Sequence, residues 1–295
     1  MIKTLALLLL FGCSAMVIAT EQANDFLRHD FSARSSALGS ADVAVSNRVD
    51  GLYSNPAGLS RGKFHHEFST TLFESFETSY YSAQYVHNIG ICYLGFGFIN
   101  SSVTGITITK DTNNDGIYDV VSTDGFTGSG YYLTASRKLN SFLHIGTNIK
   151  YIQQDLVGIS GNGIGLDAGI QLVSPSEKYT LGIAVQDITE TELKWGTGTT
   201  ERTPKTIRVG AAGYFLSNQL LLSTECKKII DTTLHLGAEY MLHPNVSVRT
   251  GLSDETIVFG MGLNMNRFFI DMSYKQETYL FSQTVYKLTL GIQFP

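Results

Sequence analysis

A short acidic loop at residues 111–119 has the residue types and spacing of a calcium site. It reads Asp-Thr-Asn-Asn-Asp-Gly-Ile-Tyr-Asp, so oxygen ligands recur at loop positions 1, 3, 5, 7 and 9. In that order the ligands would be Asp111, Asn113, Asp115, the main-chain carbonyl of Ile117, and Asp119. Position 12, a bidentate glutamate in an EF-hand loop, is Ser122 here, so we expect weak Ca²⁺ binding. The alternative is a metal-free surface loop rich in Asn, Asp and Gly.

The remaining residues do not form a recognisable catalytic set. The seven histidines are scattered and form no His-x-x-x-His pair, and the sequence has no Cys-x-x-Cys pair. The glycines of residues 161–165 are spaced like those of a phosphate loop, but the segment opens an alternating strand and lacks the P-loop lysine. No Ser/His/Asp set can be assembled. We therefore predict that the protein is not an enzyme and has no cofactor apart from the calcium considered above.

A period of two in hydrophobicity runs from residue 64 to the end of the chain. In residues 232–242, Leu234, Leu236 and Tyr240 fall on one face. His235 and Glu239 fall on the opposite face. Only a pleated strand keeps such alternate residues on separate faces. The last segment alternates in the same way and ends with an aromatic residue, which is typical of the terminal strand of outer-membrane barrels.

About fourteen such segments can be counted, most of them near the 9–11 residues of a tilted membrane-spanning strand. They are residues 64–74, 78–87, 91–106, 126–138, 142–155, 161–173, 178–189, 204–215, 217–229, 231–242, 245–252, 255–264, 267–276 and 282–294. Short turns join them at one end, and the two long connections, 106–126 and 189–204, fall at the other. This asymmetry predicts an all-β fold, a transmembrane antiparallel β-barrel over residues 63–295.

The overall composition agrees with a barrel and excludes one class of partner. Charged residues make up 16% of the chain and the formal net charge is −5. A nucleic-acid partner would require clustered basic residues, so we expect none. A secreted β-sandwich also alternates. It would not carry an apolar face along nearly every strand with aromatic residues near the strand ends.

Charges of both signs fall on the face opposite the apolar one, which is the inner face of a barrel. The strongest candidates are Lys150, Asp167, Arg208, Glu239, Arg249 and Asp271. An unpaired buried charge is costly, so we expect these side chains to pair across a narrow lumen. The alternative is a selectivity filter for a charged solute.

The N-terminus has the features of a cleavable signal peptide at residues 1–19. Lys3 is followed by the apolar run 5–11 and by the small-residue site at 17–19. Cys13 leaves a lipoprotein signal as the rival interpretation. Export and a barrel together predict the cell outer membrane of a diderm bacterium, with its lipid as the surrounding partner.

Residues 32–60 resemble the N-terminal signature of the FadL-like barrels, and more closely that of their PorV/PorQ branch. The matches are Ala33-Arg34, Leu38-Gly39-Ser40-Ala41 and the intact Asn55-Pro56-Ala57-Gly58-Leu59. Later echoes are Thr203-Pro204-Lys205 and Leu236-Gly237-Ala238-Glu239-Tyr240, so the resemblance covers most of the chain. Ser32 and Ser40 stand where the family usually has glycine.

The resemblance implies a fourteen-stranded barrel whose N-terminal segment, residues 20–62, folds inward as a small helical or irregular plug. The small residues of this segment allow close packing, and Asn55, Pro56, Ala57 and Gly58 would form a tight turn before the first strand. The inward charges would then also hold the plug. The alternative is a disordered leader ahead of the barrel.

Three functions remain open on this resemblance. The first is a PorV/PorQ-type accessory of type IX-like secretion or surface attachment, with secreted proteins or secretion machinery as partners. The second is a FadL-like channel for a hydrophobic small molecule. The third is a structural surface protein. We predict that apolar residues lining the lumen would favour transport, and that an apolar outer rim would favour partner docking.

Overall fold

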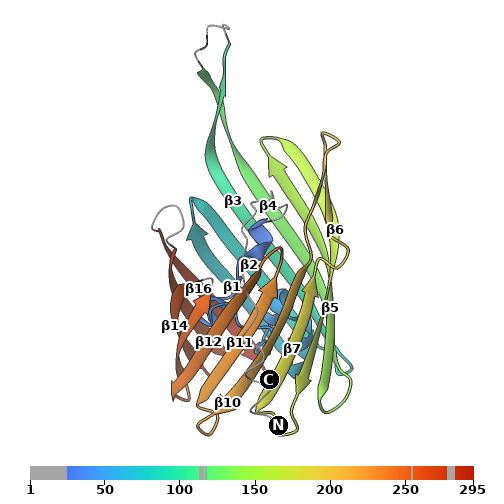
Figure 1. The fold of residues 1–295 in the computed structure, drawn as a ribbon, viewed down its shortest axis with the longest axis vertical. Coiled ribbons are helices and arrows are strands. Elements are labelled where there is room, and N and C mark those ends of the chain that lie inside the picture. The colour runs from blue at the N-terminus through green and yellow to red at the C-terminus, as the bar shows by residue number, and fades with distance from the viewer. Residues whose placement is uncertain (1–24, 113–115, 117, 254, 278–282) are drawn as a thin grey trace.

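The computed structural model describes residues 25–112, 116, 118–253, 255–277 and 283–295. The predicted signal peptide, residues 1–19, lies outside them. Fourteen long strands form a closed antiparallel barrel, as the sequence predicts (Figure 1). They are β1 (His66–Ser75), β2 (Thr78–Asn88), β3 (Tyr93–Lys110), β4 (Asp119–Lys138), β5 (Leu143–Leu156), β6 (Ile159–Val173), β7 (Tyr179–Gln186), β10 (Thr206–Phe215), β11 (Leu220–Lys228), β12 (Thr232–His243), β13 (Val246–Ser253), β14 (Thr256–Met265), β15 (Phe268–Glu277) and β16 (Gln283–Phe294).

The barrel closes where β1 pairs with β16. Their register runs from His66 opposite Phe294 to Phe73 opposite Lys287. Every other neighbouring pair of these strands is also antiparallel and hydrogen bonded. A closed wall satisfies its main-chain hydrogen bonds internally, which is the condition for crossing a bilayer with strands. No helix among the described residues has the length and apolar character needed to cross a membrane.

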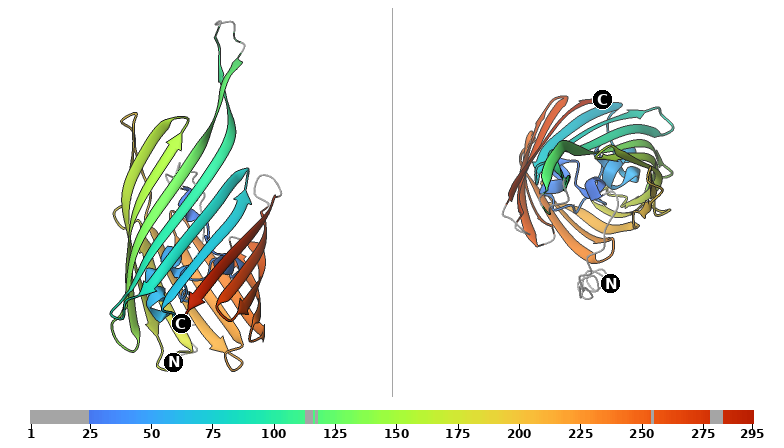
Figure 2. Two further views of the ribbon diagram at one scale, coloured as in Figure 1. Left: turned by 180° about the vertical axis from the view of Figure 1, so that it is seen from behind. Right: turned by 90° about the horizontal axis from the view of Figure 1, so that it is seen from above.

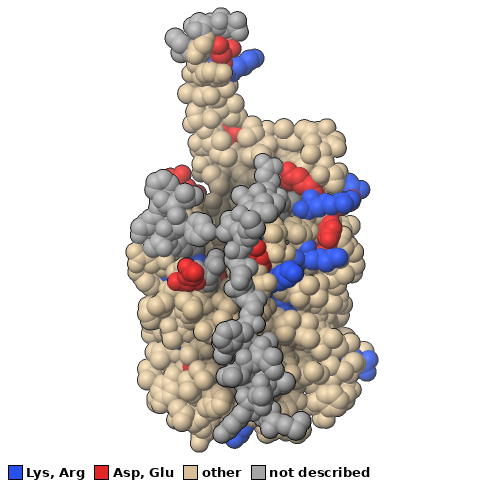
Figure 3. Space-filling view, in the orientation of Figure 1, with Lys and Arg blue, Asp and Glu red and all other residues tan. Residues whose placement is uncertain are grey.

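Apolar side chains cover the outside of the wall, and the inside is buried. On β4, Leu133 is 62% exposed, whereas its neighbours Tyr132 and Thr134 are each 4% exposed. The same alternation holds along β5, β6 and β7. Few charged side chains interrupt the lower wall in the visible face of Figure 3, and most of them gather toward the upper rim. The outer surface is therefore that of a protein surrounded by hydrocarbon.

The two ends of the barrel differ in their connections. Short turns close one end, here called the short-turn end, and the C-terminus lies there (Figure 2). At the opposite end, β3 and β4 continue well beyond the other strands as a two-stranded ribbon, so we call it the ribbon end (Figure 1).

The predicted loop at 106–126 is wrong in extent, because β3 runs to Lys110 and β4 begins at Asp119. This stretch is rich in Val, Ile and Thr, which favour strands. The two strands of a hairpin can also stay hydrogen bonded to each other outside the membrane. The predicted connection at 189–204 contains a small hairpin, β8 (Glu192–Trp195) and β9 (Thr200–Arg202). Two pairs join β8 to β6, and the side chain of Leu193 is fully buried.

Residues 25–62 lie inside the barrel, as the end-on view in Figure 2 shows. They form four short elements, η1 (Asp25–Arg28), α2 (Ala33–Ala37), α3 (Gly51–Ser54) and η2 (Pro56–Arg61). Helices of this length are not stable alone. We call residues 25–62 the plug, and its conformation depends on what it touches in the wall.

We expect lysine to be harmful on the outer wall and harmless on the ribbon. Leu133→Lys would place a charge against lipid at a cost of about 2–4 kcal/mol near the bilayer midplane. Val120→Lys, at a ribbon residue that is 66% exposed, is the control. Thermal unfolding in detergent and the yield of membrane-inserted protein should both fall for Leu133→Lys alone. Equal behaviour of the two variants would argue against a membrane-facing wall.

Candidate functional site

The Asn55-Pro56-Ala57-Gly58 motif docks the plug against the wall. The Asn55 side chain is fully buried, and its Oδ1 accepts a hydrogen bond from the Ala57 N–H at 3.1 Å. Its Nδ2 donates to the carbonyl oxygens of Val43, at 2.8 Å, and of Ile170 on β6, at 3.2 Å. Pro56 begins η2, where it has no main-chain N–H to lose. One side chain thus shapes the turn and ties it to the barrel.

Glycines on the lumen face leave room for this contact. A Cβ at Gly146 of β5 would lie 2.4 Å from the Pro56 carbonyl carbon and 2.5 Å from the Ala57 nitrogen. A Cβ at Gly169 of β6 would lie 2.0 Å from Asn55 Oδ1. The main chain of the plug therefore approaches the wall more closely than any side chain permits.

We expect Gly146→Ala to displace the plug. The added methyl group meets plug main chain rather than a flexible side chain, and overpacking of this kind costs about 1–3 kcal/mol. Gly196→Ala is the control, since the nearest atom to its Cβ would be the Ser160 oxygen at 3.6 Å. Lower thermal stability and faster proteolysis of residues 25–62 should appear in Gly146→Ala only. Protection equal to that of the control would contradict the close approach.

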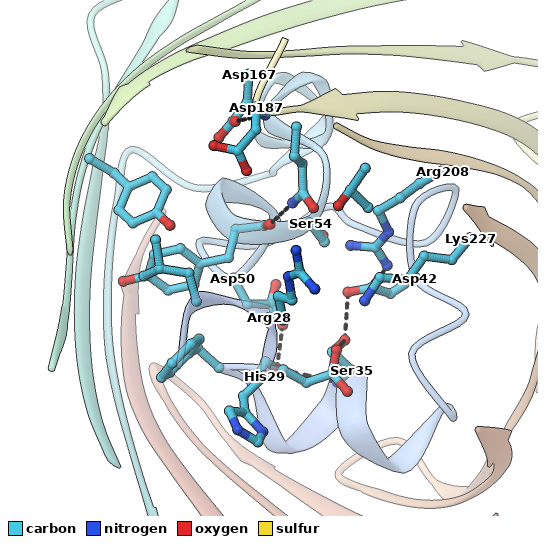
Figure 4. Close-up of a pocket in the computed structure, with 18 of the residues that line it drawn as sticks. Arg28, His29, Ser35, Asp42, Asp50, Ser54, Asp167, Asp187, Arg208 and Lys227 are labelled. Atoms are coloured by element: carbon cyan, nitrogen blue, oxygen red, sulfur yellow. Dashed lines mark hydrogen bonds and ion pairs between the residues drawn. The ribbon is translucent and has the colours of Figure 1, made fainter. Parts of the chain in front are cut away.

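The first group of lumen charges, the Arg208 network, joins β10 and β11 to the plug. Arg208 pairs with Asp42 of the plug and with Glu225 of β11, each at 2.5 Å. The Glu225 carboxylate also accepts hydrogen bonds from the main-chain N–H groups of Asp42 and Val43, at 3.0 and 2.9 Å. In Figure 4, Arg208 and Lys227 lie beside Asp42. The network fixes the chain direction after α2.

The second group, the Arg249 network, contains charges of both signs from the plug and the wall. Arg249 pairs with Glu239 and Asp271, at 2.5 and 2.7 Å. Two plug arginines complete it, Arg34 at 3.0 Å from Glu239 and Arg48 at 3.1 Å from Asp271. The Arg48 guanidinium also lies 3.5 Å from the centre of the Phe269 ring.

The third group, the Lys150 network, belongs to the wall and its loop. Lys150 Nζ lies 2.9 Å from a carboxylate oxygen of Asp167 and 2.9 Å from one of Asp187. Asn148 Nδ2 donates to Asp167 and to the Leu52 carbonyl oxygen of the plug. All six lumen charges singled out in the sequence therefore lie in three paired networks.

The plug partners of these networks were not found from the sequence. Arg34, Asp42 and Arg48 are three of eight charged residues in residues 25–62, and nothing in the sequence distinguishes them from the others. Their partners lie far away along the chain, so spacing could not reveal the pairs.

Two plug carboxyl groups have shifted acidities. Burial favours the neutral form of Asp30, but the charges of Lys287 and Lys227 outweigh it and lower the pKa to about 2. For Asp42, burial dominates over Arg208, and the nearby Glu225 and Asp30 charges add to it, so the pKa rises to about 6. Both groups are ionised at neutral pH, and Asp42 loses its charge first on acidification.

We expect Arg249→Ala to destabilise the barrel strongly. The guanidinium is 2% exposed, and removing it leaves Glu239 paired only with Arg34 and Asp271 only with Arg48. Each charged hydrogen bond lost costs about 1.5–3 kcal/mol. Arg202→Ala is the matched control, because its pair with Glu192 is 67% and 41% exposed and contributes less than about 1 kcal/mol. Thermal unfolding separates the two. Unchanged stability with altered ion preference would instead favour a selectivity filter.

A set of apolar and aromatic side chains, here called the apolar wall, lies among polar ones on the lumen face of β1 to β5. Its fully or almost fully buried members are Phe73, Tyr80, Val86, Ile99, Tyr132 and Ile152, with Leu193 of β8 beside them. Plug rings pack against it: Phe31 lies 5.7 Å from Phe73, and Tyr53 lies 5.2 Å from Tyr132, between ring centres. The Tyr53 hydroxyl donates to the Phe98 carbonyl oxygen at 3.0 Å.

Pockets lie within and on both sides of the plug. A small one of about 50 Å³ lies beside Asp42, Tyr53 and Lys150 (Figure 4). Another of about 240 Å³ lies toward the ribbon end, and two of about 530 and 370 Å³ lie toward the short-turn end. Arg61 and Lys63 line both of the latter.

The described residues of the predicted calcium loop, among them Asp111 and Asp119, lie at the far end of the ribbon. Asp111 accepts a hydrogen bond from the Gly116 N–H at 3.0 Å, and Thr112 donates to Asp119 at 2.6 Å. Asn113, Asp115 and Ile117 lie outside the described residues, so calcium binding stays a prediction.

Comparison with known proteins rests on structure. No family model matches the sequence, and no curated protein matches it. The toluene transporter TodX of Pseudomonas putida superimposes with a TM-score of 0.60 over 89% of this chain and 96% of that one, at 12% identity. The chain shares the barrel fold of that transporter. A deletion mutant of TodX, a monoaromatic hydrocarbon channel, superimposes with a TM-score of 0.63 over 90% of this chain and 99% of that one, at 13% identity. The likeness does not single out the PorV/PorQ branch.

Proposed function

We propose that the protein is an outer-membrane channel for hydrophobic small molecules. The observation that carries this proposal is the apolar wall, which gives one side of a plugged lumen the chemistry of a hydrophobic solute. The lipid-facing outer surface supports the membrane location, and the shared fold with a toluene transporter is consistent with the substrate class.

The lumen is divided between two chemistries. The charged networks hold the plug on the side formed by β10 to β15, where an apolar solute would meet ionised groups. On the opposite side, plug rings pack against the apolar wall, beside hydrogen bonds such as that from Thr71 to the Phe31 carbonyl oxygen. Contacts between apolar side chains are non-directional and can re-form around a solute, so we infer that the solute passes along the apolar wall.

The test is uptake by cells that lack other routes for hydrophobic compounds. Cells producing the protein should take up a radiolabelled monoaromatic hydrocarbon faster than cells with an empty vector. Uptake of a small charged solute, such as an amino acid, should not change. Faster uptake of the charged solute alone would overturn the proposal in favour of a polar channel.

A substitution in the apolar wall tests whether the solute passes along that wall. We expect Ile152→Asn, at a fully buried position, to slow hydrocarbon uptake by roughly tenfold, since desolvating an amide costs about 1–3 kcal/mol. Ile188→Asn, in the loop after β7, is the control and should leave uptake unchanged. Both variants must reach the membrane in equal amounts. Equal uptake by the two would place the path elsewhere.

A second candidate, an accessory of type IX-like secretion, is favoured by the ribbon. Tyr118 and Val120 are 68% and 66% exposed beyond the wall, where a partner protein could dock. Absence of hydrocarbon uptake, together with secreted proteins recovered with the barrel from native membrane, would support this function instead.

A further inference from the structure

Three histidines gather at the short-turn end of β1 and β2. His66 and His87 are cross-strand partners, with ring centres 4.3 Å apart and their Nδ1 atoms 2.8 Å apart. The ring of His65 lies 5.5 Å from that of His66 and 6.0 Å from that of His87, between centres. One ring nitrogen from each histidine lies within 4.8 Å of the other two.

The start of β1 explains how two consecutive residues reach one cluster. Neighbouring residues within a strand point to opposite faces. His65 precedes β1, and its main chain is held by hydrogen bonds from its N–H to the Phe294 carbonyl oxygen, at 2.7 Å, and from the Asn88 N–H, at 2.8 Å. Its side chain is exposed and turns toward the outward-facing pair.

The donor set has the chemistry of a transition-metal site. Neutral imidazole is a preferred ligand of Zn²⁺, Cu²⁺ and Ni²⁺, whereas Ca²⁺ and Mg²⁺ require oxygen ligands. We propose that His65, His66 and His87 bind one divalent transition-metal ion, with Zn²⁺ as the reference case and water in the fourth position.

The rearrangement needed is small. A tetrahedral Zn²⁺ with Zn–N distances of about 2.0–2.1 Å holds its ligand nitrogens roughly 3.3 Å apart. The Nδ1 atoms of His66 and His87, now 2.8 Å apart, must therefore separate slightly, and the ring of His65 must approach them, through side-chain rotation. In the metal-free pair, one of the two Nδ1 atoms donates a proton to the other. On metal binding that proton moves to Nε2 of the same ring, and the Tyr85 hydroxyl, 2.7 Å from His66 Nδ1, turns away, which leaves both Nδ1 atoms free as ligands.

The site would clamp the barrel beside its closing seam. His66 pairs with His87 on one side and with Phe294 of β16 on the other. An ion held by His65, His66 and His87 would therefore stabilise the rim where the first, second and last strands meet. Because it binds the folded state, it should raise the unfolding temperature.

The test uses the full mature chain, without a polyhistidine tag, purified in detergent. Calorimetric titration with Zn²⁺ at neutral pH should give one ion per chain and a raised unfolding temperature, and Ca²⁺ should not reproduce that rise. Losing a residue that only hydrogen-bonds to a metal ligand weakens metal sites by about 10–100-fold. His66→Asn and His87→Asn remove a ligand itself, so each should weaken Zn²⁺ binding at least tenfold. His243→Asn, at an exposed histidine on the same rim, is the control and should bind as the wild type does.

A second measurement needs no variant. Diethyl pyrocarbonate modifies accessible histidines, and Zn²⁺ should protect His65, His66 and His87 but not His243, as read by mass spectrometry of peptides. Removing Zn²⁺ with a chelator should abolish the protection. The proposal is wrong if Zn²⁺ does not bind, or if binding and protection are unchanged in both variants.

Discussion

A charge carried from water into the interior of a barrel is stable only beside a charge of the opposite sign, and the position of the plug follows from this condition. Arg34, Asp42 and Arg48 enter the lumen with the plug, and each lies within 3.1 Å of a counter-charge on a strand. Removing one member of such a pair leaves the other buried without compensation, at a cost of several kcal/mol. The pairing therefore holds the plug in one position and holds the strands in register around it.

The same condition explains why the lumen has two sides. Most of the paired charges lie on β10 to β15, with Glu67 on β1 and Lys150 on β5 as exceptions, whereas the apolar wall lies on β1 to β5. Plug residues follow the division, with Arg34 and Asp42 toward the charged side and Phe31 and Tyr53 toward the apolar wall. An apolar solute could thus contact the apolar wall while Arg34 and Asp42 keep their ion pairs with the strands.

Much of the fold could be predicted from the sequence. In a barrel strand, alternate side chains face lipid and lumen, so apolar and polar residues alternate along the sequence. The alternation in residues 232–242 and the short turns gave the strands and their number. The plug contacts could not be predicted in this way. Arg34 and Glu239 are 205 residues apart, and only the folded barrel brings them together.

The histidine cluster is also formed by residues that are distant in the sequence, so it could not be predicted as a whole. His65 and His66 are adjacent in the sequence, but motif spacing within one segment could not add His87. That residue joins them through the register of β1 with β2. The extent of the ribbon was also underestimated, because counting residues against the thickness of a bilayer ignores pairing that continues beyond it.

The closed wall has a consequence for how the chain is assembled. The Ala33 N–H donates to Thr289 Oγ1 across 256 residues, so the plug lies against the last strand. A plug packed this closely against the lumen wall is difficult to insert after β1 has paired with β16. We therefore expect the strands to assemble around the plug, and the barrel to close only when β16 pairs with β1. Such dominance of distant contacts makes folding slow, since each requires a large loop of chain to be closed first.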